Sequence, residues 1–186
     1  MTTIFNLLLV LKYRWNGLLV KLFLKALGCR VGRGLKCLKL PSFKDIPIRN
    51  IVIGDHVSLG QGVIFEIAHS GSLQIGDRCT LGDYTRYSTN NEITIGEAVA
   101  IAEQVSIRGS FHHTNRDQRI IDQGDQGEPI LIGDDVLLGS QVIVLMGSVI
   151  SEGVVIGAKS LVRKTDKLHP YGIFAGSPLK YIRDRK

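Results

Sequence analysis

Two adjacent histidines, His112 and His113, stand in the polar stretch SFHHTNRDQR at residues 110–119. An imidazole has an ordinary pKa of about 6.5, so it can accept a proton from a reacting group at neutral pH, as a general base does. A histidine in a polar stretch can also be a solvated surface group. The surrounding sequence favours the first interpretation, because the histidines interrupt a regular repeat.

A pair of asparagines, Asn90 and Asn91, interrupts the same repeat in the stretch YSTNNEITIG. A polar pair on that side could hold a hydroxyl group beside the histidines. Asn91 falls on a repeat position that elsewhere carries inward side chains, so the pair could instead cap a corner of the backbone. Both interpretations remain open from the residues alone.

The repeat has a period of six: an aliphatic residue, a glycine, two variable residues, a small residue and one more. Examples are IGDHVS from residue 53, IGDRCT from 75 and IGDDVL from 132. Its fifteen first positions are all aliphatic or aromatic: 53, 59, 65, 75, 81, 87, 95, 101, 107, 132, 138, 144, 150, 156 and 162. Eight of them are followed directly by glycine, and eleven of the fifth positions are Val, Ser, Thr or Cys.

Six residues can hold one short strand and a sharp corner, with the glycine expected to allow the backbone conformation of the turn. The first and fifth residues would then point inward and fill a narrow prism. Because the phase slips after the hexads at 65, 87 and 107, three hexads apart, three hexads make one coil and the insertions fall at corners. The sequence therefore predicts a three-sided parallel β-solenoid.

The longest insertion adds nineteen residues after the hexad that begins at 107, and it contains both histidines. A long polar excursion contributes nothing to packing of the solenoid core, and long loops in compact domains are commonly functional. We therefore expect this loop to carry the chemistry.

Charge is segregated along the 186 residues, although the net charge is only +6. Residues 1–49 contain ten Lys or Arg and one acid, residues 50–162 contain six and fourteen, and residues 163–186 contain seven and two. The ends of the chain are therefore expected to meet something anionic. The basic ends lack aromatic stacking platforms and the body is acidic, which argues against nucleic-acid binding. Three cysteines without framework spacing predict reduced thiols and a cytoplasmic location.

The segment 4–28, IFNLLLVLKYRWNGLLVKLFLKALG, is strongly apolar but is interrupted by Lys12 and Arg14, so that the uncharged run before them covers only residues 1–11. A membrane-spanning helix needs about twenty apolar residues. On a helix, Arg14, Lys21 and Lys25 lie together, and most of the remaining circumference is apolar. Such a helix suits a peripheral position at a membrane surface. The alternative is a helix that packs on its own domain or on a neighbouring subunit.

The hexads over about residues 50–178 resemble the hexapeptide-repeat acyltransferase family, which implies a left-handed parallel β-helix. The resemblance is closest to O-acetyltransferases of exopolysaccharide, capsule or lipopolysaccharide synthesis. We expect an amphipathic helix over 1–28, a β-helix over 29–167 with a loop extruded at 108–129, and a C-terminal segment over 168–186. The stretch IFAGSPLKYIRDRK resembles a family signature in which a short basic helix packs back on the solenoid.

The resemblance implies an acetyl-CoA-dependent O-acetyltransferase that acts on a sugar or lipid-linked saccharide and works as a homotrimer. In this family such a loop reaches an adjacent subunit, and a histidine near its start is the general base. Alignment of VSIRGSFHH on the family pattern places His112 at that position, with His113 as the second choice. By hexad count Asn90 is the better match to a family asparagine that holds the acceptor.

The family also has an acetyl-CoA wall, which LLGSQV and VIGAKSLVRKTD resemble. By that resemblance Ser140, Gly157 and Ala158 would line the pantetheine arm. The expected contacts to the phosphates are four basic residues, Arg163, Lys164, Lys180 and Arg183. Leu137 stands where related sugar acetyltransferases often carry tryptophan, which speaks against the small-galactoside enzymes.

Three other functions compete with this prediction. The first is transfer to nitrogen rather than oxygen of a sugar, and the second is an inactive trimeric scaffold. The third, a zinc hydratase on the same solenoid, needs three imidazoles around one metal. The five histidines at 56, 69, 112, 113 and 169 include no pair at the five-residue spacing of that family. We therefore expect no metal.

Overall fold

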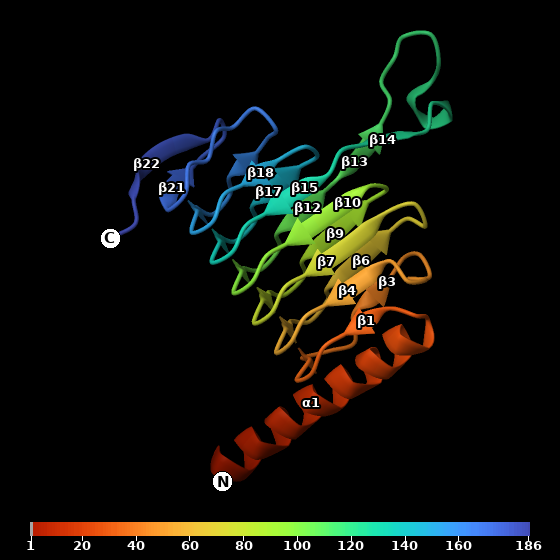
Figure 1. Cartoon of the computed structure of the whole chain (residues 1–186), viewed down its shortest axis with the longest axis vertical. Helices are drawn as coiled ribbons and strands as arrows, with labels where there is room; N and C mark the ends of the chain where they lie inside the picture. Colours follow the sequence, from red (N-terminus) through yellow and green to blue (C-terminus); the bar gives the residue numbers. More distant parts are fainter. Residues whose placement is uncertain (1) are drawn as a thin grey trace.

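The structure is a computed structural model that describes residues 2–186, with side chains described from residue 7 onward. Helix α1 (Thr2–Ala26) comes first, and the rest of the chain winds into about seven stacked coils of short strands. Figure 1 shows α1 across one end of the stack and a loop projecting near the other end. The predicted three-sided parallel β-solenoid is confirmed.

Three parallel sheets form the walls, and each regular coil gives one strand to each sheet. Sheet A consists of β1 (Arg30–Val31), β4 (Ile51–Ile53), β7 (Ser72–Ile75), β10 (Glu92–Ile95), β15 (Ile130–Ile132) and β18 (Val149–Ile150). Sheet B consists of β2 (Lys36–Cys37), β5 (Ser58–Leu59), β8 (Thr80–Leu81), β11 (Ala100–Ile101), β16 (Leu137–Leu138), β19 (Val155–Ile156), β21 (Gly172–Ala175) and β22 (Lys180–Asp184). Sheet C consists of β3 (Ser42–Phe43), β6 (Ile64–Ile67), β9 (Arg86–Thr89), β12 (Ser106–Arg108), β17 (Ile143–Leu145) and β20 (Leu161–Val162).

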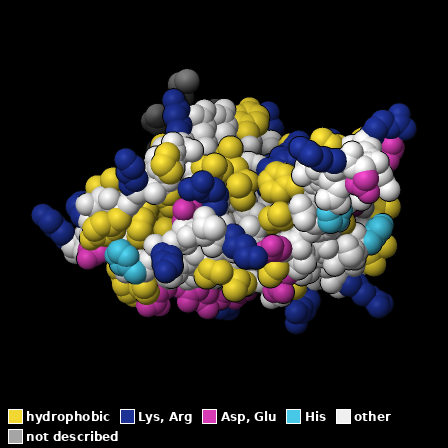
Figure 2. All heavy atoms as spheres, turned by 90° about the horizontal axis from the view of Figure 1, so that it is seen from above, with side chains coloured by type: hydrophobic (Ala, Val, Ile, Leu, Met, Phe, Trp, Pro, Cys, Tyr) yellow, Lys and Arg dark blue, Asp and Glu magenta, His cyan; other side chains and the backbone are white. Residues whose placement is uncertain are grey.

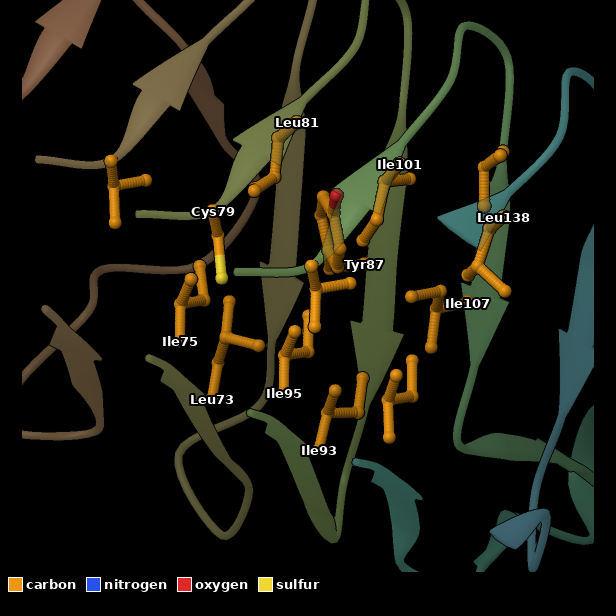
Figure 3. Close-up of a cluster of buried hydrophobic side chains, with 14 of the residues drawn as sticks. Leu73, Ile75, Cys79, Leu81, Tyr87, Ile93, Ile95, Ile101, Ile107 and Leu138 are labelled. Atoms are coloured by element: carbon orange, nitrogen blue, oxygen red, sulfur yellow. The ribbon is translucent and has the colours of Figure 1, made fainter. Parts of the chain in front are cut away.

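The core is the column of inward side chains that the hexads predict. All fifteen first positions are buried, and all eleven small fifth positions are buried as well. The strand register places equivalent hexad positions of successive coils opposite each other: Ile75 lies opposite Ile95, and Ile95 lies opposite Ile132. Figure 3 shows how such side chains from all three sheets meet along the axis. Each coil therefore buries its apolar residues against the coils above and below it.

The corners use glycine for a different reason from the one expected. The left-handed backbone conformation falls on the fourth residue of eleven of the fifteen hexads, such as His56 (φ 57°) and Gln141 (φ 62°), and not on the glycine at the second position. A Cβ atom on Gly76 would lie 2.5 Å from the carbonyl oxygen of Gly96 in the next coil. The second-position glycine is therefore required by the close approach of successive coils.

The insertion after β12 leaves the solenoid as a two-stranded hairpin, β13 (Ser110–His112) and β14 (Asp125–Gly127), with a 3-10 turn η1 (Ile120–Asp122) beyond it. In Figure 1 the hairpin and its tip project away from the coils. The core does not open, because Ile107 before the loop and Ile130 after it are both fully buried. The loop lies at the corner between sheets C and A, which we call the C–A corner.

Helix α1 covers the first coil. Leu24 is fully buried and Val20 is 4% exposed. An aromatic column runs from the helix into the solenoid: the ring centroids of Phe23 and Phe43 are 5.4 Å apart, and Phe65 follows at 5.5 Å. One face of this helix therefore packs on its own domain, which is one of the two interpretations of the sequence. Among the described residues, no helix combines the length and the apolarity needed to cross a membrane.

The predicted short C-terminal helix is wrong. Residues 180–184 form strand β22, which pairs antiparallel with β21. Without it, β21 would leave a row of unpaired backbone groups at the end of sheet B, and β22 covers that edge. Arg185 fastens the strand, because its guanidinium donates to the Asp135 carboxylate at 2.8 Å and to the Gly153 carbonyl oxygen at 2.9 Å.

Candidate active site

His112 lies at the outer end of β13, directly opposite Asp125 of β14. Its Nδ1 is 2.7 Å from Oδ1 of Asp125, and both side chains are about half exposed. A carboxylate on Nδ1 fixes the proton on that nitrogen and leaves the lone pair of Nε2 free. His112 is thus oriented to accept a proton through Nε2.

His113 has a different environment. Its backbone N–H donates to the Gly124 carbonyl oxygen at 3.0 Å, which closes the hairpin one residue beyond the His112–Asp125 pair. Successive side chains on a strand point to opposite sides, so the two histidines do not share one surface of the hairpin. Of the two, His112 alone has a carboxylate partner within the part of the chain that the structure describes.

The two asparagines lie at the base of the same hairpin. Asn91 anchors the loop, because its Nδ2 donates to the Gly127 carbonyl oxygen at 3.2 Å. The Asn90 Oδ1 lies so close to Gly127 that a Cβ atom there would overlap it. Gly127 pairs with Ser110, two residues from His112, so Asn90 lies about 7 Å along the strand from the histidine.

Ser140, Gly157 and Ala158 come together on the corner between sheets B and C, which we call the B–C corner. Gly139 N–H donates to the Ile156 carbonyl oxygen, and Lys159 N–H donates to the Ser140 carbonyl oxygen, each at 2.8 Å. The Ser140 hydroxyl beside Glu103 holds the pKa of that carboxyl below its ordinary value. Ser140, Gly157 and Ala158 all have small side chains or none, so they cover little of the backbone at their own positions.

The size of the side chains at this corner decides whether a pantetheine arm fits there. A Cβ atom on Gly157 would lie 2.8 Å from the Cβ of Ala175 in the next coil, so a larger residue would crowd that coil. Ala158 beside it is exposed. Lys180 lies opposite Ala175 in the β21–β22 pair, at the end of the same corner. These residues fit an extended arm with an anionic end near Lys180.

The remaining predicted basic residues are not on this corner. Arg163 and Lys164 follow β20 at the C–A corner, on the other side of sheet C. Lys164 Nζ is 2.6 Å from the carboxylate of Glu128, at the end of the loop that carries His112. Arg163 is turned toward Asp166, whose carboxylate accepts its backbone N–H at 2.8 Å. Arg183 is exposed on β22, where its guanidinium donates to the Asp184 carbonyl oxygen.

Sequence reasoning missed two acids, Asp125 and Glu128. Asp125 is thirteen residues from His112 in the chain, and only the pairing of β13 with β14 brings the two side chains together. The polar run on both sides of a turn was the available signal, since it is compatible with a hairpin. Among the described residues, no group of three or more His, Cys, Asp or Glu could hold a metal ion.

The chain is similar in sequence, along most of its length, to known acetyltransferases. The putative lipopolysaccharide biosynthesis O-acetyl transferase WbbJ of Escherichia coli strain K12 is 30% identical over 166 residues, which are 81% of this chain and 80% of that protein. The probable acetyltransferase Rv3034c of Mycobacterium tuberculosis is 33% identical over 159 residues, 84% of this chain. This chain spans only half of the length of that mycobacterial relative. No family model matches the chain.

Solved structures with the same fold are acyltransferases. The N-acyltransferase AntD from Bacillus cereus, in complex with dTDP and 3-hydroxybutyryl-CoA, superposes with a TM-score of 0.74 at 22% identity, over 88% of this chain and 87% of that one. The hexapeptide-repeat containing acetyltransferase VCA0836 from Vibrio cholerae superposes with a TM-score of 0.57 at 21% identity, over 84% and 74%. At these identities the likeness establishes the fold alone.

Proposed function

Because this chain belongs to the hexapeptide-repeat acetyltransferases, we propose that it transfers the acetyl group of acetyl-CoA to a hydroxyl group of a sugar, with His112 as the general base. The single observation that carries the proposal is the His112–Asp125 pair on a loop that leaves an otherwise regular solenoid. The Asp125 carboxylate fixes the tautomer of His112 and leaves Nε2 free to act as the base.

The chemical step follows from this geometry. Nε2 of His112 takes the proton of the acceptor hydroxyl as its oxygen forms a bond to the acetyl carbonyl carbon. The thioester bond breaks, and the proton held on His112 passes to the departing sulfur. Asp125 faces the imidazolium that exists between these events and stabilises its charge. Asn90, at the base of the hairpin, holds the acceptor.

The co-substrate lies along the B–C corner in this proposal. Ser140, Gly157 and Ala158 support the pantetheine arm, and Lys180, opposite Ala175, meets phosphate groups at the end of the corner. Arg163 and Lys164 face the C–A corner of the same chain. They would reach a co-substrate bound between two subunits, in the homotrimer that the family resemblance implies.

The acceptor is a sugar of surface polysaccharide synthesis. The name of the relative WbbJ supports this class. A lipid-linked saccharide is the form that we favour, because residues 1–49 contain ten basic residues against one acid and include the apolar segment 4–28. The three cysteines are buried and free, which supports a cytoplasmic location.

Calorimetric titration with acetyl-CoA, together with an assay of thiol release, tests the proposal. We expect saturable binding, and turnover with a nucleotide-linked or lipid-linked sugar. In His112→Ala turnover should fall by about 10²–10⁴-fold with binding retained. His113→Ala is the matched control and should keep its activity.

Other outcomes would each overturn a defined part of the proposal. Turnover lost in His113→Ala but kept in His112→Ala would move the base by one residue. Thiol release with amino sugars alone would indicate transfer to nitrogen. Absence of acetyl-CoA binding would leave a solenoid scaffold as the function.

A further inference from the structure

One face of α1 is fixed to the solenoid by close contacts. A Cβ atom on Gly17 would overlap the carbonyl oxygen of Leu35, so the helix backbone touches the first coil there. Asn16 Nδ2 donates to the Cys37 carbonyl oxygen at 3.2 Å, and Lys21 Nζ donates to the Gly32 carbonyl oxygen at 2.8 Å. The helix therefore has a defined orientation, with a definite outward face.

The outward face is apolar along the described length of the helix. It consists of residues at helical spacing of three and four: Leu8, Leu11, Trp15, Leu18 and Leu22. Trp15, at the centre, is 62% exposed and Leu22 is 57% exposed. All the coils lie on the other side of α1 (Figure 1). A contiguous exposed apolar stripe of this kind marks an interaction surface.

Basic side chains surround this stripe. Lys12 and Lys25 are exposed on α1, and Lys36 and Lys39 are exposed on the first coil beneath it. Arg14 and Lys21 line a cleft of about 380 Å³ between the helix and this coil. The only acid among residues 1–49 is Asp45. We call the stripe and these basic residues together the basal surface.

The other end of the molecule has no such organisation. Figure 2, which views the molecule from the end opposite to α1, shows acidic, basic, histidine and apolar side chains interspersed. The end opposite to α1 therefore differs from the basal surface.

Either a lipid surface or a second copy of the chain would cover this apolar stripe. The charge of the basal surface distinguishes between these two occupants. Residues 1–49 carry ten basic residues against one acid, so two basal surfaces brought together would repel each other. Anionic headgroups instead complement the rim, while the acyl boundary accepts the stripe. The helix of 25 residues, about 38 Å long, would lie in the plane of the bilayer surface.

We propose that the basal surface docks the protein on an anionic lipid bilayer, with Leu11, Trp15 and Leu22 inserted at the boundary between headgroups and acyl chains. The docking is a property of α1 and the first coil, and it is independent of acetyl transfer. It would bring the loop end of the solenoid to face away from the membrane (Figure 1).

Trp15 is the only tryptophan of the chain, so tryptophan fluorescence, excited at a wavelength that tyrosine does not absorb, reports on this surface alone. With the full-length protein, we expect a blue shift of the emission and co-sedimentation with vesicles of phosphatidylcholine and phosphatidylglycerol in equal parts. Vesicles of phosphatidylcholine alone should bind much more weakly. Added salt should release the protein, because it screens the attraction of lysines to headgroups.

Two pairs of variants test the two components of the surface. Leu22→Ser should weaken partitioning roughly tenfold, and Ile182→Ser, an equally exposed residue on β22, should leave it unchanged. Lys12→Gln should weaken partitioning about fivefold, and Lys167→Gln, at the far end of the solenoid, should not. All four positions are exposed, and circular dichroism verifies that each variant is folded.

Three results would overturn the docking proposal. They are no vesicle binding, equal binding to neutral and anionic vesicles, or a blue shift that grows with protein concentration without lipid and accompanies a doubled mass. The last result would identify a second copy as the occupant. In each case acetyl-CoA binding, measured on the same sample, remains a separate test of the proposed function.

Discussion

The B–C corner and the C–A corner join the same three walls, yet they are built differently. At the B–C corner each coil repeats one contact: Gly60, Gly82 and Gly139 each donate their N–H to the coil above at 2.8 Å. At the C–A corner no two coils are alike, and four of its five fifth positions, His69, Asn91, Phe111 and Asp166, lie outside the core, while Ser148 is buried.

The difference shows at which corner a solenoid can carry a functional loop without loss of core packing. Sheet C is closed from within by Phe65, Tyr87, Ile107 and Val162, which are all buried. The backbone can therefore leave at the C–A corner and return without opening the core. The B–C corner has no such freedom, because a side chain on its glycines would collide with the next coil.

The largest expected effect contrasts a residue next to the B–C corner with one on the loop. Leu138→Ala, at a fully buried first position, should lower the free energy of unfolding by about 2–5 kcal/mol, since it leaves a cavity in the axial core. Ile121→Ala, at a loop residue that is 74% exposed, should change it by less than about 0.5 kcal/mol. Denaturant unfolding measures both, and similar losses would show that the loop is part of the folded core.

The second effect concerns catalysis at the C–A corner. Asp125→Asn should lower kcat roughly tenfold to a hundredfold, because His112 keeps its place but loses the carboxylate that orients it. The Kd for acetyl-CoA and the melting temperature should not change, and Asp125→Glu should restore part of kcat. A parallel rise in KM with kcat unchanged would instead place Asp125 in substrate binding.

A smaller effect is expected at the Lys164–Glu128 ion pair, where substitution of the two partners should change acetyl-CoA binding in opposite directions. Lys164→Gln should weaken acetyl-CoA binding by about two- to fivefold, the range for an exposed charge. Glu128→Gln should strengthen it by a similar factor, because Glu128 competes with phosphate groups for Lys164. Calorimetry of both variants, with Lys167→Gln as control, checks this. The same direction of change in both variants would contradict a role of Lys164 in phosphate binding.

The smallest effect belongs to the B–C corner. The Ser140 hydroxyl lowers the pKa of Glu103 from its ordinary value of about 4.5. A carboxyl with a depressed pKa contributes stability that is present above its ordinary pKa and is lost as the pH falls through the depressed one. NMR titration of Glu103 should therefore show its pKa rise toward the ordinary value in Ser140→Ala. An unchanged pKa in that variant would mean that Ser140 does not bond to Glu103.

The sequence by itself determined the solenoid, its core and the position of the loop. A coil contacts only the coils next to it, so a period of six written along the chain already specifies which side chains point inward. Ile53, Tyr87 and Val162 all follow this rule. The interruption after Ile107 likewise locates the loop, because a segment without the period cannot continue the stack.

Only the tertiary structure decided what depends on contacts between distant parts of the chain. The partner of His112, the partner of Lys164 and the outward face of α1 each arise when separate segments close on one another. The strand β22 in place of a helix has the same origin, since residues 180–184 respond to the open edge of β21 and not to their own pattern. Local periodicity carries no information about such pairings, because they are set by the space that the finished solenoid leaves around its corners and its ends.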